Sequence, residues 1–319
     1  MSPVCLVTGA AGFIGSHLSE RLITDGYEVI GVDCFTDYYP RAMKERNIHT
    51  LRHNPRFHFV EADLRTADLG SLLNGVDYIF HFAAQAGVRS SWGENFAGYL
   101  EHNVLATQRL LEAAKGRKIT RFIYASSSSI YGNVQSLPIR EDALPRPFSP
   151  YGVTKLAGEL LCQLYCSNFE VPAVALRYFT VYGPRQRPDM AIYRFISALL
   201  RDEIITIYGD GEQTRDFTFV ADAVEASILA MGCDIPGAAF NIGGGARVTV
   251  RRVIETLEEI TGRKARLEHR QVQPGDVQHT LADTSAAQRS LGFTPKVSLR
   301  EGLQAQVTWM MNPSRLVAN

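Results

Sequence analysis

A tyrosine and a lysine four residues apart, in the segment SPYGVTK (residues 149–155), are the first side chains here that could do chemistry. Positions four apart on a helix lie one above the other, so Lys155 can approach the phenol of Tyr151. A neighbouring ammonium group favours the ionised phenol and lowers its pKa. The pair therefore predicts a tyrosinate near neutral pH, which can act as a general base toward an alcohol.

Four consecutive hydroxyls, Ser126 to Ser129, lie upstream in the segment YASSSSIYG (residues 124–132). They follow the apolar run RFIYA, at a point where a buried strand should end. Y-x-x-x-K is by itself a common pattern, and an ordinary exposed helical pair would also explain it. The serine run at a strand end, followed by the pair at a helix start, favours catalysis because both can meet at one edge of a sheet.

Three glycines in VTGAAGFIGSH (residues 7–17) follow the first apolar run with the spacing G-x-x-G-x-x-G. Glycines at a strand-to-helix turn let a pyrophosphate approach the backbone N–H groups of the helix. Asp33 ends the next apolar run, where a carboxylate accepts both ribose hydroxyls of NAD and repels the extra phosphate of NADP. We therefore expect NAD as the cofactor. The alternative is a tight turn that only packs a helix on a sheet.

Short apolar runs alternate with amphipathic segments over the first half of the chain. Strands that alternate with helices indicate βαβ units and a parallel sheet covered on both faces, which is a Rossmann-type, doubly wound α/β fold. The runs are VCLV (4–7), YEVIGVD (27–33), RFHFVEAD (56–63), DYIFHFAA (77–84), RFIYAS (121–126) and VPAVALRYF (171–179).

The regular alternation ends near residue 180, where Pro, Arg and Gly become frequent. We expect residues 1–180 to form an NAD-binding domain, with returning segments near 213–243. Residues 181–319 should form mainly a smaller, interleaved αβ lobe that binds the substrate.

The charge balance excludes some classes of partner. The 33 Lys and Arg residues equal the 33 Asp and Glu residues, so no net field attracts nucleic acid or an anionic membrane surface. Met1 leads directly into a predicted strand, and no apolar stretch approaches the roughly 20 residues of a membrane span. We therefore expect a cytoplasmic protein with no nucleic acid or membrane partner.

The five cysteines form an odd set in which only Cys162 and Cys166 are close in sequence. A disulfide framework uses an even number, and two thiols are too few for a metal. We expect reduced, structural thiols and no metal site. His17 and His81 have no matching ligand set and are interpreted as structural histidines.

The segments TGAAGFIG, SSSSIYG, SPYGVTK and RYFTVYGPR together resemble the extended short-chain dehydrogenase/reductases, in particular the nucleotide-sugar epimerases and dehydratases. The resemblance runs from Val4 to about Gln306. It implies that Ser127 completes a catalytic triad with Tyr151 and Lys155. Dehydratases of this group carry an acidic pair where this chain has Ser128 and Ser129, and the Glu common in uronic acid decarboxylases is also missing, so we expect neither reaction.

The resemblance also implies which residues surround the dinucleotide. The expected cofactor residues are Gly9, Gly12, Phe13, Ile14, Gly15, Asp33, Asp63, Leu64, Ala83, Ala84, Tyr151, Lys155 and Tyr178.

The segment RYFTVYGPRQRPDM (residues 177–190) points to the sugar. Hexose epimerases commonly have Asn where this chain has Thr180. The motif F-T-V-Y-G-P followed by R-P-D-M, like GVRSSW (87–92), is typical of the enzymes that epimerise UDP-glucuronate. It implies that Ser128, Ser129, Thr180 and Arg187 hold the sugar carboxylate, because a neutral hydroxymethyl group would leave that guanidinium unpaired. A serine cluster that caps a helix, with solvated arginines, is the alternative.

The nucleotide should bind further along the chain. YGDGEQTRDFTFVADAVEA (208–226) resembles the nucleotide clamp of the family, which implies that Arg215 reaches the diphosphate. Asp276 in QPGDV matches the acidic residue that takes the uridine ribose, and Arg89 is an additional anion contact. Gln273 stands where the family often has Arg, so one phosphate or base contact differs.

The expected function is NAD-dependent 4-epimerisation of UDP-glucuronate to UDP-galacturonate through a 4-keto intermediate. A UDP-glucuronate decarboxylase, a UDP-glucose 4-epimerase and a non-catalytic NAD-binding regulator remain alternatives. Helices near residues 97–115 and 151–168 should pair across a two-fold axis into a homodimer.

Overall fold

The computed structural model describes residues 2–134 and 136–312. A seven-stranded sheet with the order β11-β6-β5-β4-β1-β2-β3 forms the centre, and all of its neighbouring strands are parallel. Each of the six apolar runs overlaps one of its strands, so the predicted doubly wound α/β fold is confirmed. The strands are β1 (Val4–Thr8), β2 (Glu28–Asp33), β3 (Phe57–Glu61), β4 (Tyr78–His81), β5 (Arg121–Ser127), β6 (Ala173–Tyr178) and β11 (Ala239–Ile242).

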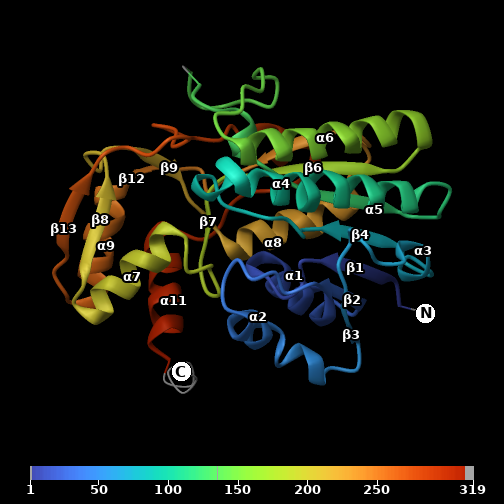
Figure 1. Ribbon diagram of the computed structural model, residues 1–319, viewed down its shortest axis with the longest axis horizontal. Helices are drawn as coiled ribbons and strands as arrows, with labels where there is room; N and C mark the ends of the chain where they lie inside the picture. Colours follow the sequence, from blue (N-terminus) through green and yellow to red (C-terminus); the bar gives the residue numbers. More distant parts are fainter. Residues whose placement is uncertain (1, 135, 313–319) are drawn as a thin grey trace.

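Helices cover both faces of this sheet (Figure 1). The helices α1 (Phe13–Thr24) and α8 (Val220–Leu229) pack together on one face, with α2 (Arg41–Ile48) beside α1. The opposite face carries α5 (Ala106–Ala114) and α6 (Pro150–Phe169). The short helix α3 (Leu69–Leu72) packs near α5, and α10 (Ser285–Leu291) packs on β11.

The side chains of each strand alternate between two hydrophobic cores. In β5, Ile123 and Ala125 belong to the core under α1 and α8, whereas Phe122 and Tyr124 belong to the core under α5 and α6. Successive side chains of a strand point to opposite faces, so a strand buried on both sides must be apolar throughout. This explains why the strands read as continuous apolar runs.

A second group of elements, at the left of Figure 1, has its own hydrophobic core. Two small sheets and three helices form it: β8 (Ile204–Tyr208) with β13 (Arg266–Arg270), β9 (Thr214–Asp216) with β12 (Arg247–Thr249), α7 (Ala191–Arg201), α9 (Val250–Thr261) and α11 (Leu299–Met311). The pair β7 (Val181–Tyr182) and β10 (Thr218–Phe219) joins this group to the central sheet.

The helix expected near 97–115 is interrupted. It consists of α4 (Phe96–Tyr99), a π-helical segment at Leu100–Leu105, and α5. A π-helix closes its hydrogen bonds over five residues instead of four, so it holds an extra residue per turn, and such turns are frequent at functional sites.

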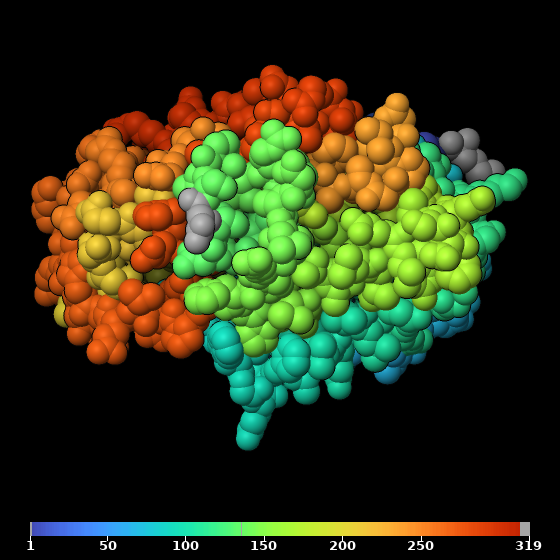
Figure 2. Space-filling model, turned by 90° about the horizontal axis from the view of Figure 1, so that it is seen from above, coloured from blue at the N-terminus to red at the C-terminus, as the bar shows by residue number. Residues whose placement is uncertain are grey.

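The outer faces of α6 and of the π-helical segment that precedes α5 expose apolar side chains. Figure 2 looks down on these elements and shows residues 96–114 and 150–169 side by side on the surface. No helix within the described residues is both long and apolar enough to cross a membrane. The exposed apolar side chains are Leu100, Leu105, Val153, Leu160, Leu164 and Phe169.

Candidate active site

A continuous cavity of about 1030 Å³ lies at the carboxyl ends of the central strands and extends to the second group of elements. The chain runs outward from β1 in both directions along the sheet, and ligands of such sheets bind where the strand order reverses. Every catalytic, cofactor and substrate residue expected from the sequence lines this cavity.

The glycine-rich turn at the start of α1 has no room for side chains. A Cβ on Gly15 would lie 2.2 Å from the carbonyl oxygen of Gly9, and Gly9 itself has φ +71° and approaches the backbone of Ala83. Gly12 is the N-cap of α1 and provides no side-chain cap. The first N–H groups of α1 are therefore approachable by a pyrophosphate, and this turn fits a dinucleotide.

Asp33 at the end of β2 is held in place by the backbone. Its carboxylate accepts from Ala11 N at 3.2 Å and from Phe35 N at 2.8 Å. Burial raises the pKa of Asp33, and these two hydrogen bonds together with the charge of Lys44 oppose the rise. The carboxylate is thus oriented beside the glycine-rich turn, where it fits a ribose with two free hydroxyls.

The four serines divide between two tasks. Ser126 also borders the cavity, but its hydroxyl donates to Glu159 Oε2 at 2.5 Å. Ser127 Oγ accepts from Ser129 N and donates to Ser129 Oγ, both at 3.1 Å, so it caps the short 3₁₀ turn Ser128–Ile130. Ser127 therefore does cap a turn, as the alternative interpretation of the serine run expected. Ser127, Ser128 and Ser129 nevertheless line the cavity.

Tyr151 lies at the start of α6, which Ser149 caps by accepting from Gly152 N at 3.1 Å. The phenol is hydrogen-bonded to Ser127, and its ring lies edge-on to Tyr99 at 6.3 Å. Burial is the largest influence on Tyr151 and raises its pKa, while the charge of Arg187 and the hydrogen bond with Ser127 oppose the rise.

Lys155 is buried one helical turn further along. Its Nζ lies 4.7 Å from the centroid of the Tyr124 ring, and burial lowers the pKa of Lys155 to about 8. The expectation that Lys155 gives Tyr151 a lowered pKa is wrong for this structure. Burial is the largest influence on the pKa of Tyr151, and Arg187 is the cation that opposes it.

The sequence analysis took Arg187 to have no partner other than the substrate, but the structure pairs it with Asp189. Its Nε and Nη2 donate to the two carboxylate oxygens of Asp189 at 3.0 and 3.1 Å. The phenol of Tyr38 also donates to Asp189 at 3.2 Å. Sequence reasoning missed Asp189, although its spacing in R-P-D was a usable signal. Thr180 lines the cavity beside this pair, and its carbonyl accepts from Thr218 N.

Arg89 and Asp276, which were expected to contact different parts of the substrate, form an ion pair with each other. Arg89 Nη2 lies 2.7 Å from Asp276 Oδ2, and the guanidinium lies 4.1 Å from the centroid of the Tyr208 ring. Arg215 donates to the carbonyls of Thr214 and Gln278. These groups gather at the end of the cavity that the second group of elements lines, and Tyr208 was missed despite its aromatic character.

Both histidines that we interpreted as structural have partners in the structure. His81 lies between the hydroxyls of Thr8 and Thr107, at 2.8 and 2.9 Å, and burial lowers its pKa to about 3. His17 Nε2 lies 2.9 Å from the carbonyl oxygen of Pro184. Their interpretation as structural residues is confirmed.

Known proteins resemble this chain over nearly its whole length. Residues 6–306 match the protein-family model described as GDP-mannose 4,6 dehydratase. The Bacillus subtilis protein named uncharacterised UDP-glucose epimerase YtcB is 48% identical over 307 residues, 96% of this chain and 97% of that protein. A UDP-glucuronate 4-epimerase of Thermodesulfobacterium geofontis is 38% identical over 320 residues, 98% of this chain and 97% of that protein.

A solved structure shares the arrangement as well as the sequence. It is a Bacillus cereus UDP-glucuronic acid 4-epimerase in complex with UDP-glucuronic acid and NAD, with a TM-score of 0.95 and 46% identity. The likeness covers 98% of this chain and 99% of the other. Together with the glycine-rich turn and the Ser127–Tyr151 contact, these matches show that the chain belongs to the GDP-mannose 4,6 dehydratase family of extended short-chain dehydrogenase/reductases.

Proposed function

We propose that this chain is an NAD-dependent UDP-sugar 4-epimerase that interconverts UDP-glucuronate and UDP-galacturonate. The observation that carries the proposal is one cavity in which Ser127 and Tyr151 are hydrogen-bonded beside Ser128, Ser129, Thr180 and Arg187. The likeness to the Bacillus cereus UDP-glucuronic acid 4-epimerase supports it.

The chemistry begins at the hydroxyl on C4 of the sugar. Tyr151 removes the proton of this hydroxyl, and Ser127 shares the hydrogen-bond network with it. Bound NAD would supply a site that accepts the C4 hydride and returns it. The charge of Arg187 favours the anionic phenol in a cavity that otherwise disfavours it. Once the 4-keto sugar has turned over in the cavity, return of the hydride to the opposite face of C4 and of the proton to the oxygen on C4 would invert the sugar.

A second set of residues holds the sugar carboxylate. Ser128, Ser129 and Thr180 offer hydroxyls, and Arg187 offers the part of its guanidinium that Asp189 does not occupy. The 4-keto form of a uronic acid is a β-keto acid, which loses carbon dioxide when its C–carboxylate bond stands perpendicular to the ketone. A held carboxylate stays out of that geometry.

The dehydratase name of the family model does not extend to the chemistry of this site. Ser128 and Ser129 occupy the positions at which such dehydratases carry an acidic pair, so the cavity lacks the acid that would expel water from the sugar. The same positions lack the glutamate that is common in uronic acid decarboxylases.

UDP-glucose is a second candidate substrate, and one observation favours it. Asp189 already balances the charge of Arg187, so a neutral hydroxymethyl group would not leave an unpaired cation. The 48% identical Bacillus subtilis protein also carries the name UDP-glucose epimerase. NMR of the products from each substrate tests the two. Inversion of UDP-glucuronate at much higher kcat/KM supports our proposal, and preferential inversion of UDP-glucose overturns it.

We further propose a division of tasks along the chain. Residues 1–180, with the returning segments near 213–243, bind NAD, and residues 181–319 bind mainly the nucleotide sugar. Gly9 and Asp33 support the first assignment, and Arg215 supports the second. The ion pair between Arg89 and Asp276, one residue from each part, supports a sugar site to which both parts contribute.

We also propose that the protein is a homodimer and that it lies in the cytoplasm. The exposed apolar side chains of α6 and of the neighbouring π-helical segment form one surface, and a second copy of this surface would cover them in a four-helix bundle. All five cysteines are free thiols, as expected in a reducing compartment. Light scattering at micromolar concentration should give a dimer, and Leu160→Glu should give a monomer. A monomeric unmodified chain would contradict the assembly.

A further inference from the structure

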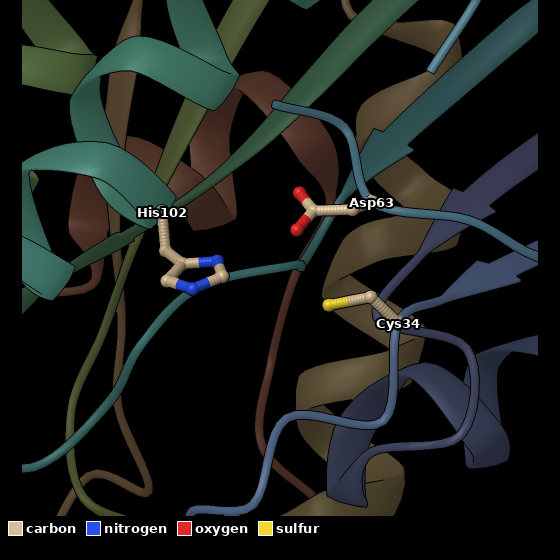
Figure 3. Close-up of side chains that lie close together, drawn as sticks. All are labelled: Cys34, Asp63 and His102. Atoms are coloured by element: carbon tan, nitrogen blue, oxygen red, sulfur yellow. The ribbon is translucent and has the colours of Figure 1, made fainter. Parts of the chain in front are cut away.

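Three side chains with metal-ligating atoms converge on the cavity wall. Cys34 directly follows β2, Asp63 lies two residues beyond β3, and His102 belongs to the π-helical segment. Figure 3 shows the three side chains pointing toward one another. One ligand atom of each lies within 4.8 Å of the other two. Residues from three separate elements are thus brought into one cluster.

The set of donors suits zinc. Thiolate, imidazole and carboxylate are the ligands that zinc takes in proteins, at bond lengths of about 2.0–2.3 Å. Ligand atoms around a tetrahedral ion of this size are about 3.5 Å apart, so the three side chains need to close by roughly 1 Å. Three protein ligands leave the fourth position of a tetrahedral ion to water. Thiolate and imidazole are softer ligands than carboxylate, so this set disfavours magnesium and calcium.

The surroundings of the cluster carry charges of both signs. Asp33 and Glu101 face it with negative charge, while Lys44 and Arg65 face it with positive charge. Arg65 holds the Asp63 carboxylate through its backbone N–H, Nε and Nη2. A carboxylate has about four acceptor positions, so these three donors leave about one for a metal. Such an outer hydrogen bond fixes the orientation of a ligand.

The protonation states of the two other ligands differ. Burial lowers the pKa of His102, so its imidazole is neutral and has a lone pair to offer. Burial raises the pKa of Cys34, so the thiol must give up its proton when a metal binds.

We propose that Cys34, Asp63 and His102 form a zinc site, and that zinc and the dinucleotide exclude each other there. All three residues line the cavity, and Cys34 is adjacent to the ribose-binding carboxylate of Asp33. We expected no metal because the only cysteines close in sequence offer two thiols, too few for a metal. The three residues of this cluster are far apart in the sequence, so the sequence did not reveal them. The mutual exclusion of zinc and NAD rests on the proposed NAD site. Zinc binding by these three residues does not depend on that site.

Zinc binding is tested on the untagged full chain after removal of nucleotide. Calorimetric titration with zinc chloride should give one site per chain, and Cys34→Ala and His102→Ala should each weaken it at least about tenfold. Cys166→Ala is the matched control, since Cys166 is a half-buried thiol that does not line the cavity, and its zinc affinity should equal that of the unmodified chain. Cobalt should give a thiolate-to-metal charge-transfer absorption that Cys34→Ala abolishes.

The exclusion is tested by titrating NAD at increasing zinc concentration. The apparent Kd of NAD should rise in proportion to zinc, and should not rise in Cys34→Ala. Unchanged zinc affinity in Cys34→Ala and His102→Ala overturns the metal site. Normal zinc binding without any effect on the Kd of NAD overturns the exclusion. Both readouts are independent of sugar turnover, so failure of the proposed epimerase activity is recognised separately.

Discussion

Glu159 of α6 and Arg177 of β6 form a buried ion pair, in which Arg177 Nη2 lies 2.6 Å from Glu159 Oε1. Glu159 also accepts from Ser126, and Arg177 donates to the phenol of Tyr131 at 2.6 Å. The pair therefore joins α6, which carries Tyr151, to β6, and Ser126 joins it to β5, which ends in the serine run. These contacts fix the position of Tyr151 relative to Ser127.

Removal of one member of this pair should destabilise the protein strongly. Arg177→Met leaves the Glu159 charge buried without its partner, and such changes cost about 3–5 kcal/mol. Urea unfolding measures the cost, and the double variant with Glu159→Met should lose less than the sum of the single variants. Arg251→Met breaks an exposed pair with Glu212 and should cost less than about 1 kcal/mol. If Arg177→Met and Arg251→Met lower the free energy of unfolding equally, burial does not make the Glu159–Arg177 pair more important for stability than an exposed pair.

Loss of the phenol should stop turnover without loss of the fold. Tyr151→Phe removes the group that exchanges a proton with the sugar, so kcat should fall by about 100-fold or more. Affinity for NAD and the thermal unfolding temperature should stay near those of the unmodified chain. Rapid-quench or coupled assays measure kcat, and retained turnover would assign the base to another residue.

Weakening the carboxylate contacts should release carbon dioxide during turnover. Arg187→Ala removes a charge-assisted contact worth about 1.5–3 kcal/mol, and Thr180→Val removes a hydroxyl at nearly constant volume. Ser127, Tyr151 and Lys155 are unchanged, so oxidation at C4 still proceeds, although more slowly in Arg187→Ala because Tyr151 loses the charge that opposes the effect of burial. We expect a higher fraction of 4-keto-pentose and of NADH per epimerisation, measured by product mass and absorbance. Variants that slow but never decarboxylate would refute restraint by these residues.

Asp216 should make stability depend on pH. Burial raises its pKa from 3.8 to about 6, although its carboxylate accepts from Gly244 N and Ala282 N. The folded protein binds this proton more tightly than the unfolded chain does, so its stabilising contribution is complete below 3.8 and is lost as pH rises through about 6.

The measurement compares urea unfolding of the unmodified chain with that of Asp216→Asn. Between about pH 4 and pH 7 the unmodified chain should lose up to about 3 kcal/mol relative to the variant, because a tenfold difference in proton affinity corresponds to about 1.4 kcal/mol. The lost acceptor of the variant adds a constant offset. A difference between the two proteins that does not change with pH would show that Asp216 has an ordinary pKa.

Features that depend on neighbours in sequence were predictable. The glycine-rich turn, the six apolar runs and the Y-x-x-x-K spacing each lie within one strand, turn or helix, and their positions on the cavity follow from the parallel sheet. Ion pairs across the fold were not predictable, since Arg89 and Asp276 are 187 positions apart. The pKa of Tyr151 was predicted in the wrong direction, because spacing to Lys155 says nothing about how much water reaches the phenol.

The π-helical segment Leu100–Leu105 makes the cavity wall sensitive to chain length. Deletion of one residue before His102 would restore a regular α-helix. Because an α-helix turns by about 100° per residue, the residues after the deletion would then rotate by about that angle relative to those before it. Either the imidazole would leave the cavity or the flanking apolar face would turn away from α6. A relative that lacks this extra residue would present a different side chain to the adenosine end of the site, even if the rest of its sequence were the same.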